Sequence, residues 1–393
     1  MENPRDAPMA ETKHIAERLL SEKFAAPIRL DEGIALQERT YVTRFNLLES
    51  PQQAPASVIV KRARLKDGSF DPNTSGWLFN DWAALQFLSE VAETEPVGPR
   101  FYTGDLTVGL FIMEDLGSGE SPDKSLLGSD AQDAEHMLID LATQLGRMHA
   151  LTIGKRACYE HIRRSLGPSA RVGFHDYQSL PTRLYFTAQA LGVSLHKDVE
   201  KELAYLVATL TDPGPFLAYT HGDPCPDNWF SSAGKLRLFD YEVGAYRHAL
   251  LDGVYGRIHF PTCWCVARIP HPIPVQMEQA YRTELVKGCP EASDDKLFSQ
   301  AVVDACAFWV LALCATDEKE LIRLRDEDWL RGPATVRQRT LLRFDIFSRS
   351  TQEFAHLPAL GAAFAELAAK LRSLWPPEAD TMPYYPAFHG LLN

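Results

Sequence analysis

The pattern of apolar residues changes near Gly117, and this change most constrains the fold. Before it, short β-branched and aromatic runs lie within 28–64 and again within 99–116. Turn-forming segments such as "DEG" and "ESPQQAPA" separate these runs, which predicts antiparallel hairpins. Apolar residues at helical spacing predict a leading helix at 10–24 and a second helix at 77–91.

After Gly117 the apolar residues recur mainly at helical spacing. The expected helices lie near residues 131–150, 196–210, 275–287, 297–315 and 355–374. One strand-like island, "KLRLFDYE", interrupts them at 235–242. We therefore predict an α+β protein that has a small antiparallel β N-lobe and a larger, mainly helical C-lobe.

The length of the chain also favours two lobes, because 393 residues are many for one compact core. We expect an N-terminal lobe at 1–116, with an inter-lobe linker at 113–117. The C-terminal lobe is expected at 117–375. A Pro- and aromatic-rich tail at 376–393 is expected to be extended.

Charge and cysteine content narrow the class of protein. The net charge of −12 disfavours a nucleic-acid partner, which a basic surplus would attract. The most apolar run, 305–315, is too short to span a bilayer, so no membrane segment is expected. Seven scattered cysteines and a polar start favour a reduced, cytoplasmic protein. "CWC" at 263–265 lacks a second Cys/His pair at zinc spacing and so does not predict a zinc site.

The segment "HGDPCPDNWF", at 221–230, concentrates polar side chains on a proline-restricted loop. Asp223 and Asn228 lie on this loop, and Asp240 follows on the strand expected at 236–242. Carboxylate and amide oxygens suit Mg²⁺, which typically takes one or two protein carboxylates and phosphate oxygens. The remaining carboxylate can accept a proton from a hydroxyl nucleophile. This division of labour is typical of kinase-type phosphoryl transfer.

Kinase-type transfer also needs a lysine on a strand of the small lobe. "SVIVKR" supplies Lys61 in a context like that of kinases, and "FNDWAALQFL" offers Asp81 as its acidic partner. In "FIMEDLG", the linker at Met113, Glu114 and Leu116 is expected to meet the adenine of ATP.

Together, "HGDPCPDNWF", "LRLFDYEVGAYRHALLD", "LGRMHALT" and "MEDLG" resemble the aminoglycoside phosphotransferase and choline kinase family over roughly residues 27–255. The resemblance implies a bilobal protein-kinase-like fold. It implies that Asp223 is the catalytic base, that Asn228 and Asp240 are metal ligands, and that Lys61 holds the phosphates of ATP.

The resemblance assigns supporting roles to further residues. His221 corresponds to a structural histidine of the loop, and Asp252 to an aspartate that braces the loop from below. Glu242 is a candidate for a metal or substrate contact, with a simple surface charge as the alternative. Two departures stand out: the family's lysine partner is usually Glu and here is Asp81, and the phosphate-covering hairpin has a single glycine, Gly33.

The acceptor is less well defined. A Pro-punctuated insertion at 256–282 is long for a connector and is a candidate substrate region. Within it, Trp264 and Arg268 are the candidate substrate residues, and Trp264 could instead be a core anchor.

The sequence thus predicts an ATP- and Mg²⁺-dependent phosphotransferase that acts on a hydroxyl of a small polar molecule, with GTP as an alternative donor. A choline, ethanolamine or sugar kinase is one alternative to an aminoglycoside phosphotransferase. A catalytically weak, nucleotide-binding regulatory protein is an alternative of another class, suggested by the two departures. A monomer or a homodimer is expected.

Overall fold

A computed structural model describes residues 6–36, 39–64, 69–168, 176–232 and 234–391. The chain forms two compact units, each built from several segments. The first unit comprises residues 1–120, 155–171 and 230–244, and the second comprises 121–154, 172–229 and 245–393. The division predicted along the chain at residues 116 and 117 stays a prediction.

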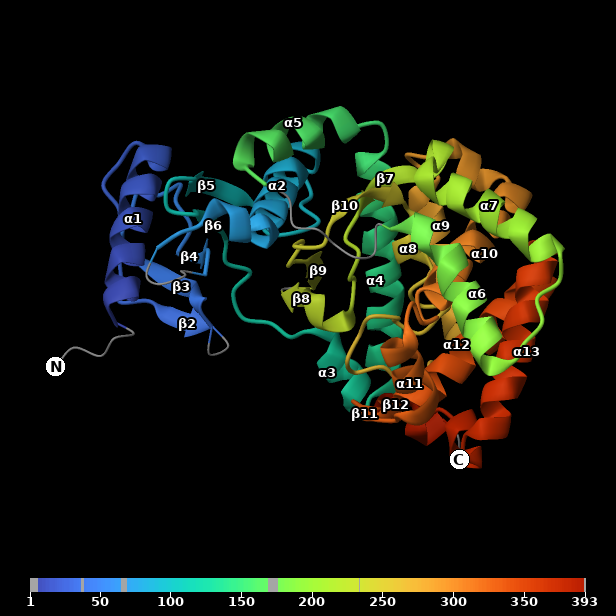
Figure 1. Ribbon diagram of the computed structural model, residues 1–393. Coiled ribbons are helices and arrows are strands. Elements are labelled where there is room, and N and C mark those ends of the chain that lie inside the picture. Colours follow the sequence, from blue (N-terminus) through green and yellow to red (C-terminus); the bar gives the residue numbers. More distant parts are fainter. Residues whose placement is uncertain (1–5, 37–38, 65–68, 169–175, 233, 392–393) are drawn as a thin grey trace. The chain divides into compact units, whose positions relative to one another are not determined.

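The first unit contains an antiparallel sheet (Figure 1). Its strands run in the order β1-β3-β4-β6-β5, and β2 pairs with β3 at one side. The strands are β1 (Arg29–Leu30), β2 (Ile34–Leu36), β3 (Arg39–Glu49), β4 (Ser57–Arg62), β5 (Phe101–Asp105) and β6 (Leu110–Glu114). β4 is central, and its apolar residues Val58, Ile59 and Val60 are buried.

The two faces of β4 do different things, because successive side chains point to opposite sides of a sheet. Val58 and Val60 join a core cluster with Leu20 of helix α1 (Asp6–Phe24). Ile59 and Lys61 point to the other side, where a cavity lies. The alternation of the strand therefore separates the core of this unit from its candidate site.

Helix α2 (Gly76–Val91) packs against the sheet through aromatic contacts, with the Trp82 ring 5.7 Å from that of Phe111. Helix α5 (Arg156–Leu166) lies against α2, and its Arg163 donates to the side chain of Asn80 at 2.9 Å. Asn80 in turn donates to the Glu242 carbonyl at 2.9 Å. This chain of contacts ties α2 to the segment that follows the paired strands β8 (Trp229–Ser232) and β9 (Lys235–Leu238).

The second unit is mainly helical. Its helices are α3 (Pro122–Leu127), α4 (Ala131–Thr152), α6 (Leu180–Leu191), α7 (Asp198–Thr211), α8 (Leu250–Gly253), α9 (Ile273–Leu285), α10 (Asp295–Leu311), α11 (Glu318–Asp326), α12 (Val336–Glu353) and α13 (Pro358–Leu374). Strand β7 (Leu217–Thr220) pairs antiparallel with β10 (Ala245–His248), and β11 (Leu330–Arg331) with β12 (Ala334–Thr335).

Helices α4 and α9 pack closely at Gly146. A Cβ atom at that position would lie 2.3 Å from the Tyr281 carbonyl oxygen, so only glycine permits this approach. Tyr281 also contacts His149 of α4, with 2.8 Å between the Tyr281 hydroxyl and His149 Nδ1. This contact between α4 and α9 holds the buried His149 ring, whose Nε2 atom lies 3.6 Å from Oδ2 of Asp252.

The combination of a small antiparallel sheet with a mainly helical remainder confirms the α+β expectation. The helices expected near 131–150, 196–210, 275–287, 297–315 and 355–374 correspond to α4, α7, α9, α10 and α13. Helix α12 was not expected, because Arg and Thr interrupt its apolar spacing; a capping box formed by Thr335 and Gln338 begins it. The tail at 376–393 contains two short 3-10 helices and is described as far as residue 391.

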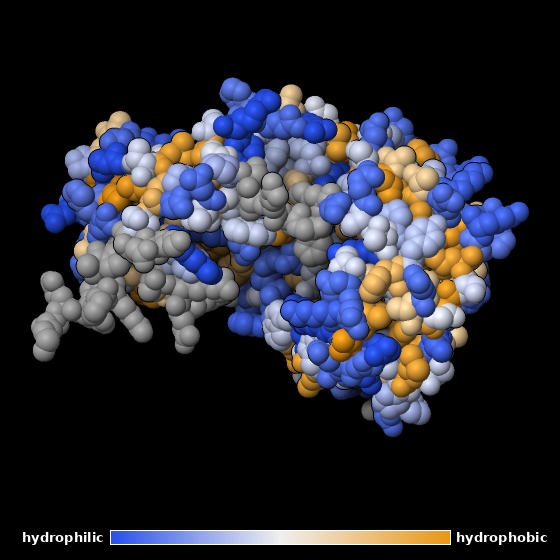
Figure 2. Space-filling view, in the orientation of Figure 1, coloured by the Kyte–Doolittle hydropathy of each residue, from blue (hydrophilic) through white to orange (hydrophobic). Residues whose placement is uncertain are grey.

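Within the described ranges, no helix combines the length and the apolar content needed to cross a membrane. Figure 2 shows hydrophilic and hydrophobic residues interspersed over the visible face. Single exposed apolar side chains of this kind are ordinary on protein surfaces.

Two buried histidines predict that acid destabilises the protein. Burial lowers the pKa of His248 from 6.5 to about 3 and that of His259 to about 4. Both imidazoles stay neutral in the folded state where the unfolded chain binds protons, so the free energy of unfolding falls as pH drops below about 6.5. Between pH 7 and pH 5 we expect a loss of about 2 kcal/mol for each histidine.

The variant His248→Asn tests this assignment by urea denaturation at pH 7, 6 and 5. The asparagine oxygen can still accept the Leu250 N–H that now donates to His248 Nδ1 at 3.2 Å. Its pH-dependent loss of stability is expected to be about 2 kcal/mol smaller than that of the wild type. His196→Asn, at an exposed position, serves as the control. Equal pH dependence in wild type and His248→Asn would contradict the prediction.

Candidate active site

Lys61 is the centre of an ion-paired group in the first unit. It lies on β4 between Val42 of β3 and Phe111 of β6. Its Nζ atom is 2.7 Å from Oδ2 of Asp81 and 2.7 Å from Oδ1 of Asp240. The structure therefore brings together three residues that are far apart in the chain.

Both aspartates are fixed by backbone features. Asp81 is buried on α2, and its Oδ1 atom accepts the Tyr241 N–H at 2.9 Å. Asp240 follows β9 with a φ angle of 66°, a left-handed conformation that Asp tolerates better than most residues. Although its side chain is one methylene shorter than Glu, Asp81 reaches Lys61 directly.

The charges of this group reinforce one another. Burial opposes the positive charge of Lys61, but the negative charges of Asp81 and Asp240 outweigh it and raise the pKa of Lys61 above its usual value. The lysine is therefore a permanent cation at neutral pH.

A cavity of about 800 Å³ opens beside Lys61. Every predicted site residue of the first unit lines it: Lys61, Asp81, Met113, Glu114, Leu116, Asp240 and Glu242. Apolar side chains, among them Leu36, Val42, Ile59 and Phe239, form much of the remaining wall. A cavity that combines apolar walls with charged side chains of both signs can bind a small polar molecule or a cofactor.

The segment at 113–117, predicted to be an inter-lobe linker, is held by side chains that were not among the predicted site residues. Asp115 accepts hydrogen bonds from Arg44 at 2.8 Å and from Ser57 at 2.7 Å. Burial opposes its charge, but the bonds from Ser57, the Gly117 N–H and Arg44 lower the pKa of Asp115. Glu114 is fixed by Arg237 at 2.5 Å. The linker backbone is thus anchored to β3, β4 and β9.

Asp223 and Asn228 lie together in the second unit. Asn228 Nδ2 donates to the Asp223 carbonyl at 2.8 Å and to Oδ2 of Asp223 at 3.4 Å. Oδ1 of Asp223 accepts from the Thr262 hydroxyl and from the Cys225 thiol. The carboxylate is consequently held in one orientation, and the amide nitrogen of Asn228 is used internally.

Asp252, for which the sequence resemblance predicts a bracing role, contacts the backbone of the loop at 221–228. Its carboxylate is buried and accepts the His221 N–H at 2.6 Å and the Gly222 N–H at 3.2 Å. Burial opposes the negative charge of Asp252 and would raise its pKa. The interactions with His149, the largest of the opposing effects, outweigh burial, so the pKa of Asp252 is lowered. The His221 ring accepts the Asp223 N–H at 3.2 Å, which is a shape-holding contact.

The insertion at 256–282 contacts the loop through several side chains. Trp264 is partly exposed and donates from Nε1 to Oδ2 of Asp227 at 2.9 Å. Arg268 is engaged by the tail instead, with its guanidinium 5.0 Å from the centre of the Tyr384 ring. A substrate role for Trp264 and Arg268 stays a prediction.

Sequence reasoning missed Thr262 and Tyr255. Thr262 donates to Asp223, and the Tyr255 hydroxyl donates to the Gly222 carbonyl at 3.0 Å. No local pattern marks either residue, because each acts through a contact across 30 or more residues of chain. Gly33, by contrast, is explained by packing: a Cβ there would lie 2.4 Å from the Phe45 ring. Residues 37 and 38, between β2 and β3, lie outside the described part of the chain.

Comparison with known proteins finds no matching family model and no matching curated protein. Solved structures do match. The choline kinase LicA of Streptococcus pneumoniae is 14% identical, with 87% of this chain and 99% of that chain covered and a TM-score of 0.37. A putative aminoglycoside phosphotransferase of Ralstonia eutropha is 14% identical, with 92% and 98% covered and a TM-score of 0.42.

A macrolide 2'-phosphotransferase of Brachybacterium faecium is also similar, at 14% identity, with 81% of this chain and 99% of that chain covered and a TM-score of 0.42. The family that this sequence resembles includes both choline kinases and aminoglycoside phosphotransferases. With identities of 14% and TM-scores of 0.42 or less, the likeness is broad, and the functional proposal below rests on this chain's own residues.

Proposed function

We propose that the protein is an ATP-dependent phosphotransferase that phosphorylates a hydroxyl group of a small polar molecule. The observation that carries the proposal is the position of Lys61, paired at 2.7 Å with both Asp81 and Asp240 in the wall of a cavity of about 800 Å³. A lysine fixed in this way on a strand, with an acidic partner on the next helix, is the phosphate-binding arrangement of kinases.

In this proposal the cavity of the first unit binds ATP. Lys61 neutralises the α- and β-phosphates, and Asp81 keeps its ammonium group in place. The apolar wall and the anchored linker at Met113, Glu114 and Leu116 receive the adenine ring. A preference for ATP over GTP requires that the linker discriminate between adenine and guanine. A competition titration of the two nucleotides measures this preference.

Asn228 and Asp240 are the proposed Mg²⁺ ligands. Their donor atoms fit this ion, because Mg²⁺ prefers amide and carboxylate oxygens. The Asn228 nitrogen donates to Asp223, which leaves the side-chain oxygen as the atom suited to a cation. When bound, Mg²⁺ supplies neutralisation of the phosphate charge that builds up during transfer.

Asp223 is the proposed base. It accepts the proton of the acceptor hydroxyl as that oxygen bonds to the γ-phosphorus of ATP, while the bond from this phosphorus to the β–γ bridging oxygen breaks and ADP leaves. Hydrogen bonds from Thr262 and Cys225 hold the carboxylate in orientation. Positioning and charge neutralisation supply most of the catalysis. We further propose that the two units correspond to the lobes of a protein-kinase-like fold.

A panel assay tests this function. Purified protein is incubated with Mg²⁺-ATP and choline, ethanolamine, simple sugars or aminoglycosides, and ADP formation and the phosphorylated acceptor are measured by coupled assay and mass spectrometry. We expect at least one acceptor to yield a phosphate ester. A preference for choline or ethanolamine over aminoglycosides identifies a metabolic kinase. Absence of any product, together with absence of ATP binding, would contradict the proposal.

A further inference from the structure

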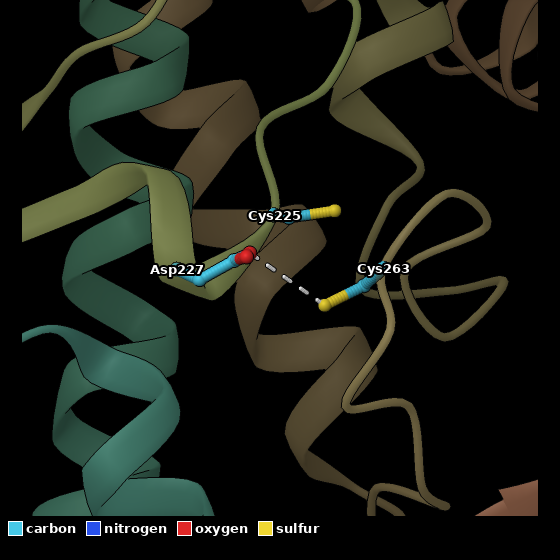
Figure 3. Close-up of side chains that lie close together, drawn as sticks. All are labelled: Cys225, Asp227 and Cys263. Carbon is cyan, nitrogen blue, oxygen red and sulfur yellow. Dashed lines mark hydrogen bonds between the residues drawn. The ribbon is translucent and has the colours of Figure 1, made fainter. Parts of the chain in front are cut away.

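A second group of possible metal ligands lies beside Asp223. Cys225, Asp227 and Cys263 each offer one ligand atom, and these atoms all lie within 4.8 Å of one another. Figure 3 shows the Asp227 carboxylate and the Cys263 sulfur pointing toward each other from two separate loops. A fourth candidate, Cys265, has its sulfur 3.1 Å from that of Cys263.

This donor set differs in kind from the one proposed for Mg²⁺. Thiolates select soft or borderline cations such as Zn²⁺, whereas Mg²⁺ prefers oxygen ligands. Two sulfurs that bind one tetrahedral Zn²⁺ at about 2.3 Å lie roughly 3.8 Å apart. The spread of the three ligand atoms is therefore already close to that of a zinc site.

We propose that Cys225, Cys263 and Asp227 bind a thiolate-preferring divalent cation of the Zn²⁺ class. Three protein ligands leave a fourth position for water or for Cys265, as in zinc sites that are not closed by the protein. The proposal concerns a site separate from Asn228 and Asp240, and metal binding itself does not depend on the proposed function.

Surrounding contacts hold the three ligands in place. Trp264 Nε1 donates to Oδ2 of Asp227 at 2.9 Å, the kind of contact that orients a ligating carboxylate. Arg339 donates to the Cys263 carbonyl at 3.0 Å and to that of Trp264 at 2.9 Å, which fixes the segment at 263–265. Cys225 and Cys263 are buried, and the partly exposed Asp227 marks the side from which an ion enters.

Metal binding at this site is expected to inhibit phosphoryl transfer, a consequence that rests on the proposed function. The Cys225 thiol now donates to Oδ1 of Asp223 at 2.8 Å. Ligation releases the thiol protons of Cys225 and Cys263 to solvent, so Asp223 loses one donor and gains a metal-bound thiolate as its neighbour. The orientation of the proposed base changes as a result.

Spectroscopic titration tests the binding. Metal-free, reduced protein is titrated with Co²⁺, whose thiolate complexes absorb in the near ultraviolet, and Zn²⁺ affinity is measured by competition with a chromophoric chelator. We expect one thiolate-bound ion per chain in the wild type. Cys263→Ser should weaken binding at least tenfold and remove the thiolate band, while Cys158→Ser, at an exposed cysteine outside the site, leaves both unchanged.

Asp227→Asn provides a second variant that retains both thiols and the side-chain shape, and its affinity is also expected to fall. If Cys263→Ser does not fold, Asp227→Asn decides. Wild-type protein that binds no Co²⁺ through thiolate, or a wild-type affinity in every folded site variant, would overturn the proposal.

The inhibitory effect has its own readout. With saturating Mg²⁺, one equivalent of Zn²⁺ should lower the rate of phosphoryl transfer by the wild type severalfold. In Cys263→Ser, the rate with Zn²⁺ should equal the rate of the same variant without Zn²⁺. A thiolate band without any phosphoryl transfer would support the metal site and count against the proposed function. Phosphoryl transfer without a thiolate band would support the proposed function and count against the metal site.

Discussion

Replacing Asp223 with asparagine is expected to lower the rate of phosphoryl transfer by roughly 10²–10⁴-fold. The asparagine retains the size of the side chain and an oxygen that accepts from Thr262 and Cys225, so the loop at 221–228 keeps its hydrogen bonds. What it loses is the ability to take a proton from the acceptor. The measurement is kcat with the best acceptor of the panel, alongside ATP affinity by titration.

ATP affinity is the decisive companion measurement for Asp223→Asn. The cavity that contains Lys61 lies in the first unit and does not include residue 223, so ATP affinity should stay within about twofold of the wild type. The matched control is Asp212→Asn, which makes the same change at the exposed residue that follows α7. Full activity in Asp223→Asn would remove Asp223 from the role of base.

The second large effect is expected from Lys61→Met, which should impair both stability and ATP binding. Removing the ammonium group leaves Asp81 as a buried carboxylate without a cationic partner, a change that costs about 3 kcal/mol of unfolding free energy. Loss of a charged donor to phosphate should weaken ATP binding by about tenfold or more. Thermal denaturation and titration with a fluorescent ATP analogue measure the two effects.

A double variant separates these two consequences. In Lys61→Met with Asp81→Asn the buried negative charge is gone, and the asparagine oxygen can still accept the Tyr241 N–H. Most of the lost stability should therefore return, whereas ATP binding should remain weak. Lys235→Met, at an exposed lysine of β9, is the control. Recovery of ATP binding in the double variant would show that Lys61 acts only as a structural partner of Asp81.

The parts of the candidate site that sequence reasoning predicted are those that local patterns encode. Lys61 ends an apolar strand, and Asp223 and Asn228 share one short loop, so a few neighbouring residues define each of them. To predict the pairing of Lys61 with Asp81, it was enough to recognise that a helix follows the strand. The small sheet and the longer helices were found for the same reason, since periods of two and 3.6 residues are local signals.

The rest depends on contacts between distant segments, which a single sequence does not reveal. Thr262 is 39 residues from Asp223, and Arg44 is 71 residues from Asp115. The cysteine group shows the limit most clearly. "CWC" has no nearby partner pair, and its partners Cys225 and Asp227 come from a loop that was interpreted for another chemistry.

The buried carboxylate of Asp252 has a consequence for how freely the loop at 221–228 can change. It holds that loop through the backbone N–H groups of His221 and Gly222, and every residue except proline carries such a group. This anchor fixes the backbone of residues 221 and 222 whatever their side chains, whereas the His221 ring and the Asn228 side chain hold the backbone at residue 223. Protein engineers who wish to alter acceptor preference should therefore leave the loop, with its buried Pro224 and Cys225, unchanged and vary exposed side chains of the segment at 256–282, such as Trp264, instead.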